Sequence, residues 1–485
     1  MFKVVEGNSQ GLADADEFMR LINAPPAELC DFFDRESDIL VSRAPGRLDV
    51  MGGIADYSGS LVLEMPIAES TFVAVQKTDD ARISIASLQP ASRELLTFGM
   101  GLDVLAVDAR RCYEIARNLF RRAERDQWAS YVAGTFFVLQ REIGARFECG
   151  ARLLIASEVP VGKGVSSSAA IEVATMQSVC FAYNIELDAR RIALLCQKVE
   201  NRIVGAPCGV MDQITASCGA ENSLISLLCQ RAEIQGMINI PDGIEFWGID
   251  SGVRHAVSGS DYTSVRTGAF MGYRIIADLA GLRTRTTGRE IVDIEDGRWR
   301  GYLANISPAE YEDLFAANIP EEMTGIEFIE RYQGITDDET EIDPRSAYAV
   351  RGPTAFPIYE NDRVTRFSHI LKGSDVVDRL DLLGSLMLES HAGYAACGLT
   401  ESGTNRLVDM VREAHGEGLF GARITGGGSG GTVAVLGRSG CRPVVDKIAS
   451  EYQKETGRKP YVFTGSSPGC GAFGTIRLAP WSNDA

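Results

Sequence analysis

Short segments in the first half of the chain alternate hydrophobic and polar residues, a two-residue period that is typical of half-buried strands. These predicted strands are Asp38–Ser42, Thr71–Lys77, Arg82–Ala86 and Ala151–Ala156. Longer segments with a helical period follow. These predicted helices are Trp128–Ile143, Ser168–Tyr183 and Asp188–Val204. Strands and helices are interleaved, so the sequence predicts a mixed α/β or α+β fold.

The second half of the chain repeats this mixture. Its predicted helices are Tyr262–Leu282, Asp375–Gly393 and Val444–Thr456, and its predicted strands are Thr432–Leu436 and Lys459–Phe463. The segment Gly236–Gly243 separates two apolar stretches and places a domain boundary near residue 240. We therefore predict two domains, residues 1–240 and residues 241–485.

Residues 286–351 differ in character from the rest of the second half. They contain several prolines and an acidic run, which consists of Asp337, Asp338, Glu339, Glu341 and Asp343. We interpret them as an arm inserted into the second domain, and we expect the acidic run to be a solvated surface segment.

The composition narrows the classes of function. Of the 485 residues, 45% are hydrophobic and 24% are charged, which is ordinary for a globular protein. Acids outnumber bases by 66 to 48, and the net charge of −18 repels phosphate backbones and anionic lipids. The N-terminal residues show no signal-peptide pattern, and no run of about 18 apolar residues occurs. We expect a cytoplasmic protein that binds neither nucleic acid nor membranes.

The cysteines and histidines favour neither a disulfide framework nor a zinc site. The 11 cysteines are scattered and form no CxxC pair, which is typical of reduced thiols used as small core residues. The 4 histidines are His255, His369, His391 and His415, and none has the paired spacing of a structural zinc ligand.

A glycine-rich segment, residues 159–170, runs from a predicted strand into a predicted helix. Its sequence is VPVGKGVSSSAA, with small residues in the first turn of the helix. Glycines let a backbone approach a phosphate closely, a helix N-terminus offers unpaired N–H groups, and serine hydroxyls can ligate Mg²⁺. The segment lacks the Walker pattern, so it is consistent either with a phosphate site or with a serine-capped turn.

Two further glycine-rich segments flank it in the sequence. Residues 44–59 pack two carboxylates, an arginine and a tyrosine into a tight loop, which suits recognition of sugar hydroxyls or a turn closed by its own aspartates. Residues 423–432 carry five glycines in six positions and run directly into a strand, which favours close approach to a ligand over a linker.

In this order, the three segments resemble the GHMP kinase superfamily, and within it the galactokinase branch. The motifs that carry the resemblance are APGRLDVMGGIADYSG, VPVGKGVSSSAAIEVA, ENRIVGAPCGVMDQ and RITGGGSGGTVAV. The resemblance begins at about Val41 and is greatest to the L-arabinokinases. It implies an α+β fold of two domains, a mixed sheet-and-helix N-terminal half and an α/β sandwich C-terminal half, with the active site between them.

The resemblance also implies roles for individual residues. Asp212 matches the aspartate that takes the proton of the anomeric hydroxyl, and Arg47 matches its arginine partner, so these two are the predicted catalytic residues. Ser168 and Glu200 match the Mg²⁺ ligands, a hydroxyl and a carboxylate that suit a hard cation. For Glu200 alone, a solvated helix carboxylate would otherwise be the simpler interpretation.

Binding residues follow from the same motifs. The predicted sugar-binding residues are Gly53, Ile54, Asp56, Cys208, Gly209 and Tyr262. The predicted ATP-binding residues are Gly162, Gly164, Val165, Ser166, Ser167, Ser168, Ala169, Gly427 and Gly428. The implied cofactors are ATP and Mg²⁺.

One departure from the galactokinase pattern bears on the sugar. Gly53 and Ile54 stand where galactokinases have a glutamate and a histidine, whereas Asp56 is retained. In the family that glutamate reads the 6-hydroxyl and the aspartate reads ring hydroxyls. L-Arabinopyranose matches D-galactopyranose at carbons 2, 3 and 4 but lacks the hydroxymethyl group, so the change favours L-arabinose. Gly53 is also expected to create space that could admit galactose.

Three other positions are unusual. Lys163 stands where glycine is common, and we expect its side chain to point outward. Ser429 replaces a common aromatic, with no predicted effect. Cys208 lies in the catalytic stretch, but no histidine is near it in sequence and the family transfers phosphate directly, so we do not expect a cysteine nucleophile.

The leading hypothesis is an ATP-dependent sugar-1-kinase that converts L-arabinose to L-arabinose 1-phosphate. The alternatives are a galactokinase and a non-catalytic galactokinase-like regulator that senses sugar and ATP. Arg47, Ser168 and Asp212 are all present, which favours catalysis over sensing.

Overall fold

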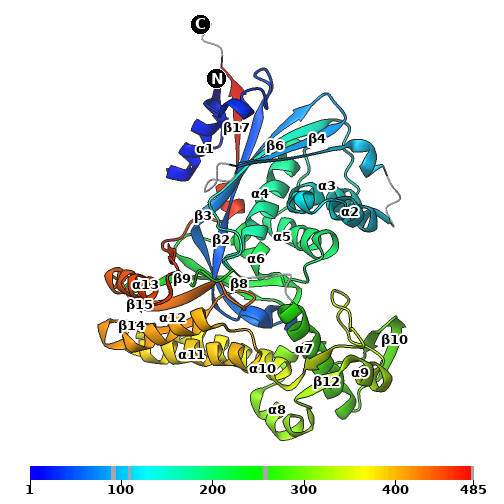
Figure 1. Ribbon diagram of the computed structural model, residues 1–485, viewed down its shortest axis with the longest axis vertical. Helices are drawn as coiled ribbons and strands as arrows, with labels where there is room; N and C mark the ends of the chain where they lie inside the picture. The colour runs from blue at the N-terminus through cyan, green and yellow to red at the C-terminus, as the bar shows by residue number, and fades with distance from the viewer. Residues whose placement is uncertain (89–93, 107–110, 255–259, 482–485) are drawn as a thin grey trace.

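The computed structural model describes residues 1–88, 94–106, 111–254 and 260–481 (Figure 1). His255 lies outside these residues. In the described part of the chain, no helix is both long and apolar enough to span a membrane.

The first layer is a nine-stranded sheet, antiparallel except for one parallel pair. Its main path runs β1 (Phe2–Glu6), β17 (Thr475–Pro480), β2 (Ile39–Met51), β3 (Leu61–Thr78), β6 (Gly150–Ser157), β4 (Arg82–Leu88) and β5 (Leu95–Gly101). The start of β3 also pairs with β7 (Ser223–Leu228), which pairs with β8 (Glu233–Asn239). Strands β2 and β3 are the longest, and they extend from this sheet down to the candidate site.

Helices cover one face of this sheet (Figure 1). They are α2 (Cys112–Arg121), α3 (Ser130–Ile143), α4 (Ser167–Ala182), α5 (Ala189–Val199) and α6 (Met211–Cys218). Helices α2 to α5 share a buried core with alternate residues of the sheet, such as Val73 and Val75 of β3 and Leu153 and Ile155 of β6. Helix α1 (Ala13–Asn23) packs on the opposite face, against Phe72 and its neighbours.

The second sheet has four strands, in the order β14 (Leu419–Ile424), β15 (Thr432–Arg438), β9 (Ile244–Asp250) and β16 (Val462–Phe463). Both of its faces are buried, because residues of β15 alternate between two cores. Val433 and Val435 face helices α12 (Ser402–Glu413) and α13 (Arg442–Thr456). Ala434 and Leu436 face helices α10 (Arg351–Leu371) and α11 (Leu380–Ala396).

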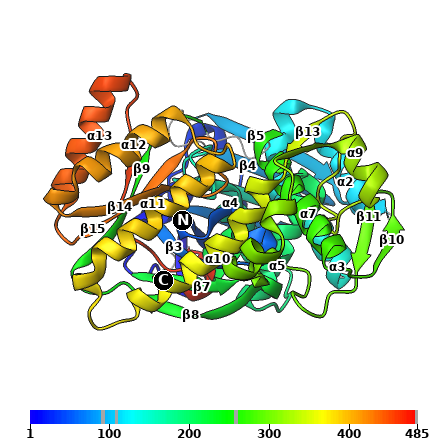
Figure 2. The same ribbon diagram turned by 90° about the horizontal axis from the view of Figure 1, so that it is seen from below.

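Helices α10 and α11 connect the two sheets. They lie side by side in both views (Figures 1 and 2). Their buried residues, among them Phe367 and Leu383, pack at the same time on β15 and on Leu48 and Met65 of the long strands β2 and β3. The two sheets therefore share one continuous apolar layer.

The chain returns to the first sheet at its end. Strand β17 pairs antiparallel with both β1 and β2, after helix α14 (Cys470–Phe473). Figure 1 shows both termini at the same end of the molecule, far from the second sheet. The domain boundary near residue 240 stays a prediction.

Residues 286–351 pack beside α7 (Ser260–Leu279) and α10 (Figure 1). This region contains β10 (Thr284–Gly288), β11 (Ile291–Ile294), α8 (Pro308–Leu314), β12 (Glu322–Thr324), α9 (Gly325–Tyr332) and β13 (Ala347–Ala349). Its aromatic side chains, including Trp299 and Phe328, form a core with α7. The expectation of a wholly solvated acidic run is wrong, because Asp337 is buried against Arg266.

The predicted strands and helices are confirmed, with differences at their ends. The predicted helix Asp188–Val204 is two pieces: α5 ends at Val199, and a π-helical turn continues over Glu200–Val204. A π-helical turn shifts the side chains that follow it around the helix axis, and such turns are frequent at functional sites. The predicted helix at Asp375 begins with a 3₁₀ turn, and the strand predicted from Lys459 is reduced to β16.

Candidate active site

The three glycine-rich segments meet around the last residues of β2. The Arg47 N–H donates to the Val165 carbonyl at 3.1 Å, which joins the first segment to the second. The Thr432 hydroxyl donates to the Lys163 carbonyl at 2.8 Å, which joins the third segment to the second. Asp49 accepts from the Gly426 N–H at 3.1 Å and joins the third to the first. Segments that are far apart in sequence thus form one wall.

Arg47 and Asp212 form the ion pair at the centre of this wall. Arg47 Nε and Nη2 lie 2.9 Å and 2.8 Å from Asp212 Oδ1, and Arg47 Nη1 donates to the Gly164 carbonyl at 2.7 Å. Arg47 comes from β2, and Asp212 from the first turn of α6. The arginine side chain is buried, whereas the aspartate remains partly exposed toward the cavity.

A second carboxylate lies behind Arg47. Glu64 Oε2 of β3 lies 3.3 Å from Arg47 Nε, and both Glu64 oxygens are buried without a hydrogen-bond partner. Burial raises the pKa of Glu64 well above its ordinary value, and Asp49 raises it further. Burial alone would lower the pKa of Arg47, but Asp212, Glu64 and Asp49 together raise it above its ordinary value. Arg47 is therefore charged, and its geometry directs that charge to Asp212.

A cavity of about 80 Å³ lies against this ion pair. Its lining brings together predicted residues of three kinds: catalytic, sugar-binding and ATP-binding. They are Arg47, Ile54, Asp56, Gly162, Gly164, Val165, Ser166, Ser167, Ser168, Glu200, Cys208, Gly209, Asp212, Tyr262 and Gly427. Met211 and Gly426 also line it.

Asp56 is the unsatisfied acceptor of this cavity. It lies in the 3₁₀ turn Gly53–Ser58, and its Oδ1 atom is buried with no hydrogen-bond partner among the described residues. Burial raises the pKa of Asp56 to about 7, and Asp212 raises it while Arg266 opposes the shift. A buried carboxylate oxygen without a partner is costly, so a ligand hydroxyl at this position would stabilise it.

Gly209 is required by the position of Asp56. A Cβ atom at residue 209 would lie 1.7 Å from Asp56 Oδ2, so any side chain here would displace the carboxylate. The preceding residue, Cys208, is a thiol whose pKa burial raises well above its ordinary value. Its Sγ lies 3.1 Å from Asn201 Oδ1, and these surroundings do not activate a thiolate.

The glycine-rich loop before α4 ends in a strained residue. Ser166 precedes α4 with φ 59° and ψ 46°, a left-handed conformation that a non-glycine residue rarely adopts. Its hydroxyl is buried and has no hydrogen-bond partner in the part of the chain that the structure describes. The open N-terminus of α4 and this hydroxyl both point to an anion as the occupant of the loop.

Ser168 and Glu200 provide oxygen ligands that fit Mg²⁺. The Ser168 hydroxyl hydrogen-bonds the Glu200 carboxylate, and Gln213 Nε2 donates to Glu200 Oε2 at 2.7 Å. The same Gln213 nitrogen lies 3.2 Å from Glu172 Oε2, whose other oxygen is buried and unpartnered. Burial, with a contribution from the charge of Asp212, raises the pKa of Glu200 to about 7. Buried carboxylate oxygens beside a hydroxyl are the kind of ligands that a hard cation prefers. The described residues hold no group of three or more acidic, histidine or cysteine side chains that could enclose a metal ion, so other oxygens would have to complete the coordination.

A larger cavity of about 600 Å³ adjoins the first through Gly162, Ser167, Ser168 and Glu200. Its other walls carry the positive side chains of Arg117, Arg121 and Arg254 and the aromatic rings of Trp128 and Tyr131. This combination suits a nucleotide. The sequence analysis missed these arginines, because isolated basic residues carry no motif.

Gly53 does not create the expected space, and that expectation is wrong. A Cβ atom at this residue, where φ is +54°, would lie 1.8 Å from Tyr394 Oη and 2.7 Å from Arg423 Nη2. The Tyr394 hydroxyl accepts from the Ile54 N–H at 2.9 Å and donates to the Gly426 carbonyl at 2.6 Å. Tyr394 therefore occupies the volume that a larger residue 53 would fill.

Lys163 also differs from the expectation. Its Nζ lies 2.6 Å from Asp250 Oδ2, a nearly fully buried carboxylate at the end of β9, so the side chain does not point outward into solvent. This ion pair joins the glycine-rich loop before α4 to the second sheet. Ala169 and Gly428 are outside the set of described residues that line the two cavities. The binding roles of all the predicted site residues stay predictions.

Three family models match the chain. They are the galactokinase galactose-binding signature over residues 28–77, the GHMP kinase N-terminal domain over residues 130–220 and the GHMP kinase C-terminal domain over residues 376–453. The three matches contain Arg47, Asp56 and Asp212 but not the arm.

Two relatives are similar over nearly the whole chain. An L-arabinokinase of Arabidopsis thaliana is 43% identical over 98% of this chain and 52% of its own length. The chain thus spans about half the length of that relative. A galactokinase of Chloroflexus aggregans is 30% identical over 87% of this chain and 91% of its own length.

A solved structure shares the fold. The crystal structure of Lactococcus lactis galactokinase complexed with galactose superposes with a TM-score of 0.70 at 19% identity, covering 93% of this chain and 98% of the other. The predicted α+β GHMP kinase fold is thereby confirmed. Because a galactokinase matches over most of both sequences and the family models cover all three glycine-rich segments in part or whole, the chain belongs to the galactokinase family of GHMP kinases.

Proposed function

We propose that the protein is an ATP- and Mg²⁺-dependent sugar-1-kinase whose preferred substrate is L-arabinose. The observation that carries this proposal is the arrangement around one cavity: its lining brings together the Arg47–Asp212 pair, Asp56 with its Oδ1 atom free of any described hydrogen-bond partner, and the N-terminus of α4. A polyhydroxylated acceptor and a phosphate donor can therefore meet at Asp212.

The transfer is a direct displacement. The anomeric oxygen of the sugar forms a bond to the γ-phosphorus of ATP, and the bond from that phosphorus to the β–γ bridging oxygen breaks to release ADP. The hydroxyl proton moves to Asp212, which lies partly exposed at the cavity wall. In such a dissociative reaction the position of the proton acceptor matters more than its base strength.

Arg47 has two tasks in this scheme. Its hydrogen bond from Nε and the close contact of Nη2 orient Asp212, and its buried charge offsets negative charge on the transferring phosphoryl group. Ser168 and Glu200 would hold Mg²⁺, which when bound neutralises phosphate oxygens. The strained Ser166 and the glycines beside it let the loop backbone approach the phosphates.

The choice of L-arabinose rests on the wall formed by Ile54. Tyr394 fills the volume beside Gly53, and Ile54 offers only an apolar side chain to the cavity. The 6-hydroxyl of D-galactose would be buried there without an acceptor, at a cost of about 1–3 kcal/mol. L-Arabinopyranose has no such group. The similarity to an L-arabinokinase over 98% of the chain supports the same choice.

The test is a steady-state assay over L-arabinose, D-galactose, L-fucose and D-glucuronate, with the 1-phosphate product identified by phosphorus NMR. We expect L-arabinose to exceed D-galactose in kcat/KM by about 10-fold or more. A preference for galactose would overturn the choice of L-arabinose, but the assignment as a sugar kinase would still hold. Binding of sugar and ATP without transfer, by an intact protein, would instead favour the sensing role.

A further inference from the structure

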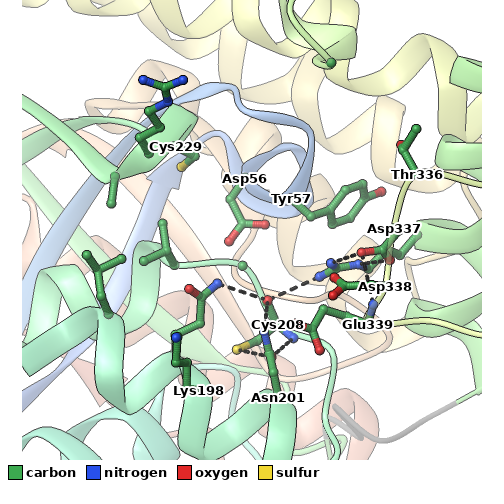
Figure 3. A pocket seen from close by; sticks show the side chains of 18 of the residues that line it. Asp56, Tyr57, Lys198, Asn201, Cys208, Cys229, Thr336, Asp337, Asp338 and Glu339 are labelled. Atoms are coloured by element: carbon green, nitrogen blue, oxygen red, sulfur yellow. Dashed lines mark hydrogen bonds and ion pairs between the residues drawn. The ribbon is translucent and has the colours of Figure 1, made fainter. Parts of the chain in front are cut away.

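A cavity of about 920 Å³ lies behind the sugar-binding wall, between α5 and the arm. It shares Asp56, Cys208 and Gly209 with the smaller cavity, so these three residues form the partition between the two. Figure 3 shows Asp56 and Cys208 on this partition, with Asp337 and Asp338 of the arm opposite. What holds the partition in place therefore determines the shape of the sugar site.

Arg266 braces this partition from behind. It lies on α7, one turn after Tyr262, and is buried. Its Nη1 donates to the Cys208 carbonyl at 3.2 Å. Its guanidinium carbon lies 5.5 Å from the centre of the Tyr57 ring, and Tyr57 is the residue after Asp56. The Arg266 side chain thus contacts both segments that form the sugar-binding wall, the one that contains Cys208 and the one that contains Asp56 and Tyr57.

Asp337 of the arm fixes Arg266. Its two oxygens accept from Nε at 2.8 Å and from Nη2 at 2.7 Å, a two-bond geometry that sets the plane of the guanidinium. Asp337 is itself held by the Thr340 hydroxyl, which donates at 2.8 Å. This ion pair is almost fully buried, unlike its neighbour between Arg202 and Asp338, where the Asp338 side chain is 65% exposed.

The position of Arg266 also affects the charge of Asp56. Its positive charge opposes the effects of burial and of Asp212, both of which raise the Asp56 pKa. An ionised Asp56 can accept hydrogen bonds from two sugar hydroxyls, whereas a protonated one loses part of this capacity.

We propose that Arg266, held by Asp337 of the arm, is a positioning residue for the sugar site, which it shapes through the Cys208–Gly209 backbone and Asp56. The arm is thus part of the sugar-recognition apparatus and not only a surface insertion. This inference rests on the proposed function.

Four variants and one control test it: Arg266→Gln, Arg266→Lys, Asp337→Asn, the double variant Arg266→Gln with Asp337→Asn, and Asp338→Asn. For each, kcat, the KM for L-arabinose and the KM for ATP are measured, together with the melting temperature and sugar affinity by calorimetry. Asp338→Asn is the matched control, because it removes the neighbouring carboxylate of the same arm at an exposed pair.

We expect Arg266→Gln to raise the KM for L-arabinose by about 10-fold or more, with the KM for ATP changed less than about 2-fold. Arg266→Lys keeps the charge but not the planar fork, so its effect should be intermediate. Asp337→Asn should shift the sugar KM in the same direction by a smaller factor. The double variant should be no worse than Arg266→Gln, because Asp337 acts through Arg266. Asp338→Asn should match wild type.

Three other outcomes would contradict the role proposed for Arg266, and a fourth would contradict the proposed kinase activity instead. If folded Arg266→Gln leaves the sugar KM and sugar affinity unchanged, the inference is wrong. It is also wrong if the sugar KM, the ATP KM and kcat all deteriorate in step with the melting temperature, or if the two single effects add. If Arg266→Gln does not fold, Arg266→Lys and Asp337→Asn decide by the same criteria. A wild-type protein without sugar phosphorylation would overturn the proposed function instead, and sugar affinity would still test Arg266.

Discussion

At the residue scale, Arg47 lies beside two carboxylates, Asp212 and Glu64, that make different contacts with its guanidinium group. Asp212 Oδ1 accepts a hydrogen bond from Arg47 Nε at 2.9 Å and lies 2.8 Å from Nη2, whereas Glu64 Oε2 lies 3.3 Å from Nε and accepts no hydrogen bond from the described residues. Burial raises the pKa of Glu64, which favours its neutral form and leaves the Arg47 charge to Asp212. The chemistry of the site thus depends on which of its acids remain ionised.

Replacing Asp212 by asparagine tests the proton acceptor. The amide keeps the shape and can still accept from Arg47, but it cannot take the hydroxyl proton. We expect Asp212→Asn to lower turnover by at least about 100-fold while ATP affinity, measured by calorimetry, stays near wild type. Turnover close to wild type in the purified variant would contradict the assignment.

Glu200→Gln tests the metal ligand. The change removes one negative charge from the oxygen cluster around Ser168, so the Mg²⁺ concentration needed for half-maximal activity should rise by about 10-fold. The KM for sugar should change much less. Glu186→Gln, at an exposed position, is the control. An unchanged Mg²⁺ titration in Glu200→Gln would mean that this carboxylate only supports Gln213.

The pKa of Asp56 predicts a pH dependence of sugar binding. Burial raises this pKa to about 7, so Asp56 is mostly ionised at pH 8 and mostly protonated at pH 6. Because the ionised form is the better acceptor, we expect sugar affinity to fall by up to about 10-fold between pH 8 and pH 6. Asp56→Asn should bind sugar more weakly at pH 8 and show a flatter profile. A wild-type affinity that rises toward pH 6 would contradict this.

At the element scale, the turn Gly53–Ser58 is held from the far side by helix α11. Tyr394 of that helix takes a hydrogen bond from this turn and gives one to the third glycine-rich segment. Its hydroxyl lies where a side chain at residue 53 would begin. A glutamate at residue 53 therefore cannot be added unless Tyr394 moves, and specificity at this point is shared by two elements.

A glycine-to-alanine comparison measures this contact. Gly53→Ala combines a positive φ with overlap against Tyr394, whereas Gly144→Ala combines a positive φ with open space. We expect the first to lower the free energy of unfolding by about 1–3 kcal/mol more than the second, measured by urea denaturation. Equal losses of unfolding free energy in the two variants would show that Tyr394 can move aside without destabilising the protein.

The sequence predicts the elements better than their contacts. The short apolar run Thr432–Leu436 identifies β15, and the small residues after Gly164 identify the start of α4, because these signals are local. Arg266 pairs with Asp337, which is 71 residues away in the sequence, and Lys163 pairs with Asp250 of the second sheet. No local sequence pattern reveals either pair. The acidic run around Asp337 illustrates why these contacts cannot be predicted. Whether a carboxylate is solvated depends on which parts of the chain pack over it, and Asp337 is buried against Arg266.

The place of Tyr394 illustrates the same point for the candidate site. The motif shows that a glutamate is missing at residue 53, but not that a tyrosine 340 residues from Ile54 fills the volume. The left-handed Ser166 is equally invisible in sequence, because serine at a helix start ordinarily indicates a cap in an extended conformation.

At the scale of the whole molecule, the candidate site lies where the two sheets share the α10–α11 layer, and the strand β17 ties the end of the chain to the first sheet. Residues 1–240 alone lack this strand. Without it, β2 has an unpaired edge from Ile39 to Ser42, and β1 has no described strand partner.

We therefore expect the fragment 1–240 to be insoluble or to show no cooperative unfolding by circular dichroism. The matched fragment, in which residues 468–481 follow residue 240 through a flexible linker, should be more soluble because it restores β17. A fragment 1–240 that unfolds cooperatively would show that the first sheet does not depend on its last strand.

The pairing of β17 with β2 also sets an order of events during synthesis. Ser42 and Thr475, which lie opposite each other in the sheet, are 433 residues apart in the chain. At the usual elongation rate of about 5–20 residues per second, the edge of β2 emerges from the ribosome roughly 20–90 s before its neighbour exists. During that interval the edge presents unpaired N–H and C=O groups beside the apolar residues Val41 and Ile39. A nascent chain of this protein is therefore exposed to misassociation early, and its yield in cells should depend on chaperones that bind extended apolar segments until the last strand is made.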